Sequence, residues 1–145
     1  MSFLQSLNIS GSGLTAQRFR MDVISENIAN QDATRTEDGG PYRRKMVVLS
    51  SANNNFKSMM IKNLNDYEAT GGVEVSEIMD DPSEFKLVFN PEHPDADENG
   101  YVSMPNVDTL KETVDMMEAY RAYQANITAL NTTKQMAVKA LEIGR

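Results

Sequence analysis

The last third of the chain carries apolar residues at spacings of three and four, which is the pattern of an α-helix. From Val107 to Ile143 there is no proline and no glycine, so nothing interrupts a helix there. Asn106 is expected to cap its first turn and Gly144 to end it. The apolar positions are Val107, Leu110, Val114, Met117, Tyr120, Tyr123, Ile127, Leu130, Ala137 and Leu141. They predict a helix of about 55 Å, which is longer than a compact domain of this size can bury.

The first segment, residues 2–30, also has a helical pattern. Its apolar residues follow the heptad spacing of a helix seam, at Leu4, Leu7, Leu14, Met21, Ile24 and Ile28. Gly11 and Gly13 weaken the first half of this helix, because each costs about 1 kcal/mol relative to alanine. Part of the longer C-terminal helix would stay exposed after the two helices pack together, and an exposed apolar stripe usually marks a protein partner.

The middle of the chain has the alternation of short strands. Strands are predicted at 42–49, 73–79, 85–89 and 100–104, and residues 50–72 are predicted as a loop with a turn of helix near 59–64. The expected fold class is α+β and mainly α, with long N- and C-terminal helices packed as a coiled-coil-like hairpin and a small β-rich central insert. The expected segments are 1–30, 31–106 and 107–145, of which the first and last form one helical domain.

The distribution of charge narrows the possible partners. The whole formal net charge of −7 lies in residues 31–106, and both end segments are neutral. An acidic centre argues against nucleic acid, and neutral helices can pack closely on copies of themselves. The absence of cysteine excludes disulfides and thiolate sites. The N-terminus lacks the pattern of a cleaved signal peptide, and no apolar run is long enough to cross a bilayer.

One stretch resembles half of a calcium-binding loop. Asp95, Asp97, Asn99 and Gly100 match the first positions of that motif, but the twelfth position is Asn106, where the motif needs a bidentate glutamate. The loop is preceded by a strand-like segment rather than a helix. A tight turn with an acidic rim is therefore favoured, with Gly100 in the left-handed conformation and a strand following.

Other candidate chemistry is weak. The acidic residues around the second and third predicted strands are expected to face water; they are Glu74, Glu77, Asp80, Asp81 and Glu84. The basic run 43–45 is too short for nucleic acid and is expected to line a strand or a subunit contact. The single histidine, His93, lies between two prolines in a loop. No phosphate loop or nucleophile motif is present, so the residues by themselves predict no cofactor and no metal site.

Three stretches carry a resemblance to a known family. They are SENIANQDATRTEDGGPYRRKMVVL at 25–49, NPEHPDADENGYVSMPNVD at 90–108 and EAYRAYQANITALNTTKQMAVKALEIG at 118–144. Over nearly its whole length the chain resembles the bacterial flagellar basal-body rod proteins, and most of all their C-type, proximal-rod branch. Residues 27–30 resemble the signature that rod and hook proteins share, and residues 123–126 resemble their C-terminal pattern. The stretch 51–70 looks longer than expected for that family.

The resemblance implies a structural role and no enzyme activity. Terminal helices of neighbouring subunits would line a hollow drive shaft, the proximal rod, which motility requires. Partners would be copies of the chain, other proximal and distal rod proteins, and basal-body ring and export-gate proteins, but not nucleic acid or the membrane interior. The subunit would be exported by the flagellar type III system without a cleaved signal. It would lie outside the cytoplasmic membrane, in the periplasm where an outer membrane is present.

The expected subunit interface lies on the two terminal helices. Its residues are Leu7, Leu14, Met21, Ile24, Asn27, Ile28, Asn30, Met117, Tyr120, Tyr123, Gln124, Asn126, Ile127, Leu130 and Leu141. The amides of Asn27, Asn30 and Asn126 are expected to fix the register between helices, as a buried asparagine does in coiled coils. The alternative for Asn30 is that it only ends the first helix.

Two other classes of function stay open at this stage. A cytosolic helical adaptor would bind a partner helix through the stripe at 107–141 and would form a soluble oligomer of fixed size. A calcium-binding module would be stabilised by millimolar calcium and would lose that effect in Asp95→Ala.

Overall fold

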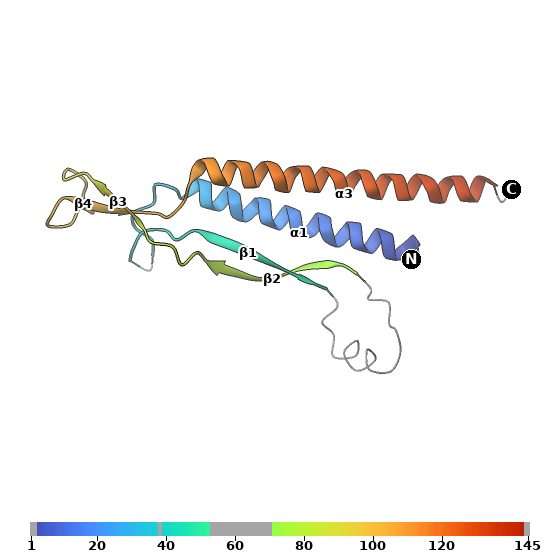
Figure 1. Ribbon diagram of the computed structural model, residues 1–145, viewed down its shortest axis with the longest axis horizontal. Helices are drawn as coiled ribbons and strands as arrows, with labels where there is room; N and C mark the ends of the chain where they lie inside the picture. The colour runs from blue at the N-terminus through green and yellow to red at the C-terminus, as the bar shows by residue number, and fades with distance from the viewer. Residues whose placement is uncertain (1–2, 38, 53–70, 144–145) are drawn as a thin grey trace, which may run out of the picture. The chain divides into compact units, whose positions relative to one another are not determined.

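A computed structural model of the chain describes residues 3–37, 39–52 and 71–143. The elements are α1 (Phe3–Ala29), β1 (Lys45–Ser51), β2 (Val73–Asp80), β3 (Lys86–Phe89), β4 (Tyr101–Met104) and α3 (Thr109–Ile143), as Figure 1 shows. Strand β1 pairs with β2, and β3 pairs with β4, in two separate two-stranded sheets. The predicted fold class is therefore confirmed. The predicted helical turn at 59–64 and most of the long stretch 51–70 lie outside the described residues.

The chain divides into two compact units, and each contains parts of both helices. Unit 1 comprises residues 1–19, 48–77 and 119–145, and unit 2 comprises residues 20–47 and 78–118. Among the described residues, neither helix has an apolar stretch long enough to cross a membrane.

In unit 2 the end of α1 and the start of α3 run antiparallel. Asn27 bonds to Glu112, and Arg20, two turns earlier on α1, forms an ion pair of 3.7 Å with Asp115, one turn later on α3. The buried apolar side chains of this unit are Val23, Ile24, Tyr42, Val102 and Val107. They come from α1, the loop before β1, β4 and the residues before α3, so a small core fixes the β3–β4 hairpin and both helices to one another.

In unit 1 the two helices approach closely because small residues face each other. Ala16 and Ala119 are buried, and a Cβ atom on Gly13 would lie 3.1 Å from the Asn126 side chain. The backbone N–H of Val73 donates to Ser12 Oγ at 3.1 Å, which joins β2 to α1. Glycine and serine are therefore packing residues here, and α1 continues through both glycines that were expected to weaken it.

The phase of the predicted stripe on α3 is wrong in its first part, from Leu110 to Tyr120, and right at Tyr123, Leu130 and Ala137. Eight of the less exposed positions of the helix alternate by four and three, at Glu112, Met116, Ala119, Tyr123, Asn126, Leu130, Thr133 and Ala137. On the helix the predicted stripe begins instead at Leu110, which is 77% exposed, and from Val114 to Tyr123 it advances by steps of three. Since an α-helix has 3.6 residues per turn, such a stripe winds from the outer face of the helix to the inner one. We call the eight inner positions the seam.

The two glycines of α1 give a matched stability test. Nothing lies within 4 Å of a Cβ atom built on Gly11, so Gly11→Ala should raise the free energy of unfolding by about 0.5–1 kcal/mol through helix propensity. At Gly13 the Asn126 amide must move, so Gly13→Ala should gain little and Gly13→Val should cost about 1–3 kcal/mol. Urea unfolding followed by circular dichroism measures all three. Equal gains for both alanine variants would show that the Gly13 approach is not tight.

Candidate assembly surface and the polar cluster that positions it

The most buried polar residues of the described chain lie in unit 2, where α1, β1 and α3 meet. Asn27 is 1% exposed and Glu112 is 0% exposed. The Asn27 amide nitrogen donates to Glu112 Oε2 at 3.0 Å and to the carbonyl of Lys45 at 2.9 Å. The Asn27 Oδ1 atom accepts from the Lys45 backbone N–H and from the Tyr42 hydroxyl, both at 2.9 Å. The side-chain amide of Asn27 therefore joins α1 to α3 and to the start of β1 through four hydrogen bonds.

Arg44 completes this cluster by contacting three carboxylates. Its guanidinium lies 2.6 Å from Glu112 Oε1, 3.3 Å from Asp81 Oδ2 and 3.4 Å from Asp115 Oδ2. Burial alone would lower the pKa of Arg44, but the hydrogen bond and charge of Glu112, and then those of Asp81, outweigh burial and raise it. The buried Glu112 carboxylate is thus satisfied by a charged donor on one oxygen and by the Asn27 amide on the other, which is what burial of a charge requires.

Asn106 and Asp81 extend the cluster to the β3–β4 side. Asn106 Oδ1 accepts from the Arg44 backbone N–H at 2.8 Å, and its amide nitrogen donates to Ser83 Oγ at 2.8 Å. Hydrogen bonds from Ser83, that of its backbone N–H first, lower the pKa of the Asp81 carboxyl, and Arg44 adds to the effect. The alternating pattern predicted that Asp81 faces water. That prediction is wrong, because its carboxylate is bonded to Ser83 and Arg44.

The expected helix cap at Asn106 is also wrong, because Asn106 is bonded elsewhere. Asp108 caps α3 instead, since its Oδ1 atom accepts from the backbone N–H groups of Leu110 at 3.0 Å and Lys111 at 3.5 Å. The sequence offers two good capping residues within three positions, and only the tertiary bonds of Asn106 decide between them.

Tyr42 gives the cluster a measurable pH dependence. Burial, and then the negative charges of Glu26, Asp80 and Glu112, raise the pKa of its phenol from 10.0 to about 12. A raised pKa means that the neutral phenol stabilises the fold fully below pH 10, and that this contribution is lost as the pH rises toward 12.

We therefore expect Tyr42→Phe to be less stable than the unmodified chain at pH 8, because the bond to Asn27 is lost, and the difference should shrink above pH 10. Urea unfolding between pH 8 and the alkaline limit measures the difference. Ultraviolet difference titration of the two chains should show one of the five tyrosines ionising last. A Tyr42 phenol that ionises together with the other four would contradict this.

The acidic stretch at 95–100 is a turn, as the sequence favoured. The Gly100 N–H donates to the carbonyl of Asp97 at 2.8 Å, and Gly100 has a φ of 78°, in the left-handed region. Strand β4 follows directly. The Asp95 carboxylate accepts from the Thr34 hydroxyl at 2.8 Å, so it faces the loop after α1 rather than its neighbours in the turn. Within the described residues, no group of acidic or histidine side chains has the arrangement of a metal site.

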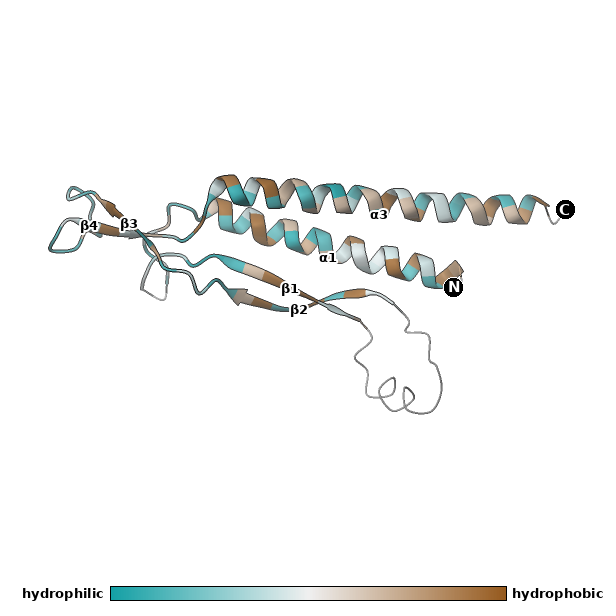
Figure 2. Cartoon of the chain, in the orientation of Figure 1, coloured by the Kyte–Doolittle hydropathy of each residue, from teal (hydrophilic) through white to brown (hydrophobic). Residues whose placement is uncertain are grey.

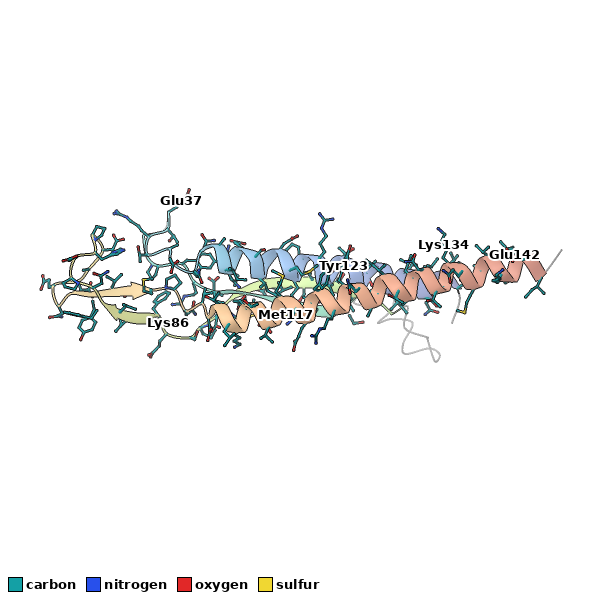
Figure 3. All side chains as sticks on the ribbon, turned by 90° about the horizontal axis from the view of Figure 1, so that it is seen from above. Glu37, Lys86, Met117, Tyr123, Lys134 and Glu142 are labelled. Atoms are coloured by element: carbon teal, nitrogen blue, oxygen red, sulfur yellow. The ribbon has the colours of Figure 1, made fainter. Side chains whose placement is uncertain are left out.

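The residues predicted for the subunit interface fall into three groups. Ile24 and Asn27 are buried within unit 2. The half-buried ones are Leu7, Leu14, Met21, Ile28, Asn30, Tyr123, Asn126 and Leu130. The exposed ones are Met117, Tyr120, Gln124, Ile127 and Leu141. Figure 3 labels Met117 and Tyr123 on α3. The exposed group has more surface left for another subunit than the other two groups.

Within the chain, one of the three asparagines of the register hypothesis contacts the other helix. The Asn27 amide bonds to Glu112 on α3, and its role in fixing the register stays a prediction. The Asn30 amide instead donates to the carbonyl of Glu26, and the Asn126 amide to the carbonyl of Ala122, each on its own helix. Helix α1 ends at Ala29, so Asn30 has the helix-ending position that was its alternative.

Exposed apolar side chains lie at both ends of α3. In unit 2 they are Leu110, Val114 and Met117, on the helix face opposite to the seam. In unit 1 they are Tyr120, Ile127, Met136, Val138, Leu141 and Ile143. Figure 2 shows hydrophobic positions interspersed along the whole helix. Leu141 continues the seam four residues after Ala137 but is 77% exposed.

Comparison with known proteins assigns this arrangement to a class. Residues 7–35 match the model of the family "Flagella basal body rod protein", and residues 98–143 match "Flagellar basal body rod FlgEFG protein C-terminal". The first match contains Asn27 and the second contains Glu112, the two partners that join α1 to α3. The chain is therefore similar to flagellar basal-body rod proteins over most of both helices.

Full-length relatives narrow the class to one family. The chain is 51% identical to the flagellar basal-body rod protein FlgC of Bacillus subtilis, over the whole of both chains. It is 46% identical to FlgC of Borreliella burgdorferi, covering 99% of this chain and 98% of that one, and 43% identical to FlgC of Salmonella typhimurium over the whole of both. The chain belongs to the FlgC family of flagellar basal-body rod proteins, and its role is that of a structural rod protein.

Proposed function

We propose that this chain is a subunit of the proximal rod, and that it assembles through its terminal helices, residues 1–30 and 107–145, into the hollow drive shaft of the flagellum. The observation that carries the proposal is the end of α3. Met136, Val138, Leu141 and Ile143 point in different directions around the helix, yet they are 62%, 48%, 77% and 86% exposed. At 3.6 residues per turn, Met136 and Ile143 lie on one face of the helix and Val138 and Leu141 on the opposite face. Exposed apolar surface usually marks a protein partner, so these turns call for more than one neighbouring chain.

The polar cluster supports the same proposal by a different argument. It costs free energy to bury Glu112 and Arg44, and such clusters are used where one arrangement of helices must be selected over others. In a rod, each subunit must present its α3 surface in the same register, and the bonds of Asn27 to α3 and β1 provide that register. No catalytic step is part of this role.

The partners we propose are copies of the chain, other proximal and distal rod proteins, and the ring and export-gate proteins of the basal body. Export through the flagellar type III apparatus would place the subunit outside the cytoplasmic membrane, in the periplasm where an outer membrane exists. The fifteen residues predicted for the interface remain our candidates, and the five exposed ones come first.

Deletion of the gene in its native host tests this function. We expect non-motile cells whose basal bodies lack a complete rod, and rescue of both defects by the intact gene. Motile cells with complete rods after the deletion would overturn the proposal and would bring the helical-adaptor alternative forward.

A further inference from the structure

The β3–β4 hairpin presents an apolar face that no described part of the chain covers. In its antiparallel register Phe89 pairs with Tyr101 and Leu87 with Ser103, so these side chains share one face. Leu87, Phe89 and Tyr101 are 67%, 64% and 45% exposed, whereas Val102, on the other face, is 2% exposed and belongs to the core. The rings of Phe89 and Tyr101 meet edge to face with centroids 5.3 Å apart, so the exposed face is ordered by its own contacts.

The charge around this face has one sign. Glu92, Asp95, Asp97 and Glu98 lie in the loop that joins the two strands, and residues 87–106 contain no lysine or arginine. Two copies of the hairpin would therefore repel each other if they met face to face. The partner that fits is apolar and basic.

The helical part of unit 1 has both properties. Its described residues 3–19 and 119–143 carry four bases, Arg18, Arg121, Lys134 and Lys139, and one acid, Glu142. Figure 3 labels Lys134 and Glu142 on α3. The exposed Met136, Leu141 and Ile143 lie in the same last turns of α3 as Lys134 and Lys139. Lys139 forms an ion pair of 2.7 Å with Glu142, so residues 134–143 have a net charge of +1. An apolar surface among bases on one unit thus matches an apolar surface beside acids on the other.

We propose that the β3–β4 hairpin of one copy docks on the last turns of α3, residues 134–143, of a neighbouring copy. This contact rests on the proposed rod function and specifies one of its interfaces. The two surfaces differ, so the contact is heterologous and repeats from copy to copy, which builds a ring or an open helical array rather than a two-fold symmetric dimer; the proposed rod is the open array. Leu87, Phe89 and Tyr101 supply the apolar contact, and the acidic loop selects the basic turns of α3.

The absence of cysteine permits a direct test. Cells lacking the chromosomal gene would produce two variants together, Phe89→Cys and Leu141→Cys, each with its own tag. A short bismaleimide would then be added to isolated basal bodies. We expect a cross-linked pair that contains both tags. The matched control replaces Leu141→Cys by Leu110→Cys, a leucine of the same 77% exposure at the other end of α3, and should give at least tenfold less product.

The outcomes separate the contact from the rod function. Motile cells with complete rods but no product from the 89–141 pair above the 89–110 control would overturn the contact and leave the rod function intact. A product that joins Phe89→Cys to a different rod protein would also overturn it. If the cysteine variants fail to assemble, a charge-reversal test replaces them. The double variant Glu92→Lys with Glu98→Lys should block assembly. Adding Lys134→Glu and Lys139→Glu to the same chain should restore assembly. Assembly that is blocked without such restoration would overturn the proposal.

Discussion

Replacing Glu112 by alanine is expected to lower the free energy of unfolding by about 3 kcal/mol. Glu112 is fully buried, and its two carboxylate oxygens hold Arg44 at 2.6 Å and Asn27 at 3.0 Å. Removing one member of a buried ion pair leaves the other charge poorly compensated, which costs more than the pair itself contributed. Asp81 and Asp115 remain beside Arg44, so the loss should fall at the lower end of the range for buried pairs.

Urea unfolding of the full chain measures this effect. The matched control is Glu118→Ala, which removes an exposed carboxylate from the same helix and should change stability by no more than about 0.5 kcal/mol. The double variant Glu112→Ala with Arg44→Ala should lose less than the sum of the two single losses, because the unpaired charge is gone. Strictly additive losses, or a Glu112→Ala variant as stable as the control, would show that the buried pair does not hold α3 to the insert.

The helical spacings of apolar residues were sufficient to predict both helices, and the alternating runs located the four strands of the described residues to within a few residues. They did not predict which face of the first turns of α3 packs inside the chain, and the reason is physical. The seam contains Glu112, Asn126 and Thr133, which hydrophobicity does not mark, while the outer face begins with Leu110 and Val114, which it does. A protein that assembles has two apolar surfaces, and a single sequence does not say which one faces its own chain.

The members of the polar cluster differ in how far the sequence could reveal them. Asn27 was found because it lies in a segment that resembles the rod and hook signature. Arg44 stands between Arg43 and Lys45, and nothing in that run tells which base is buried. Glu112 could have pointed to the cluster, because it is a charged residue one heptad before Ala119, which the structure shows to be buried. Its partners come from residues 68 and 85 positions away, which only the folded chain brings together.

The Asn27→Asp variant should show the second large effect, and one that depends on pH. The substitution keeps the shape of the side chain and the oxygen that accepts from Lys45 and Tyr42. It removes the N–H groups that donate to Glu112 and to the Lys45 carbonyl, and it places a carboxylate about 3 Å from Glu112. Since an uncompensated buried charge costs about 3–5 kcal/mol, we expect a loss of that size at pH 7.

The direction in which the stability loss of Asn27→Asp changes with pH follows from the negative charge of Glu112 beside the introduced carboxyl. Glu112 nearby should raise the pKa of the introduced carboxyl above its value in the unfolded chain, so the folded variant should take up a proton as the pH falls. The protonated carboxyl can donate to Glu112 as the amide does, and the loss relative to the unmodified chain should shrink between pH 7 and pH 5. Asp81 does not disturb this comparison, because its lowered pKa confines its own effect to pH values below about 3.8. Urea unfolding at both pH values, with the exposed Asn8→Asp on α1 as control, measures the difference. A loss that is the same at pH 5 and pH 7 would mean that the carboxylate turns away from Glu112, and that the register of α1 against α3 does not depend on this bond.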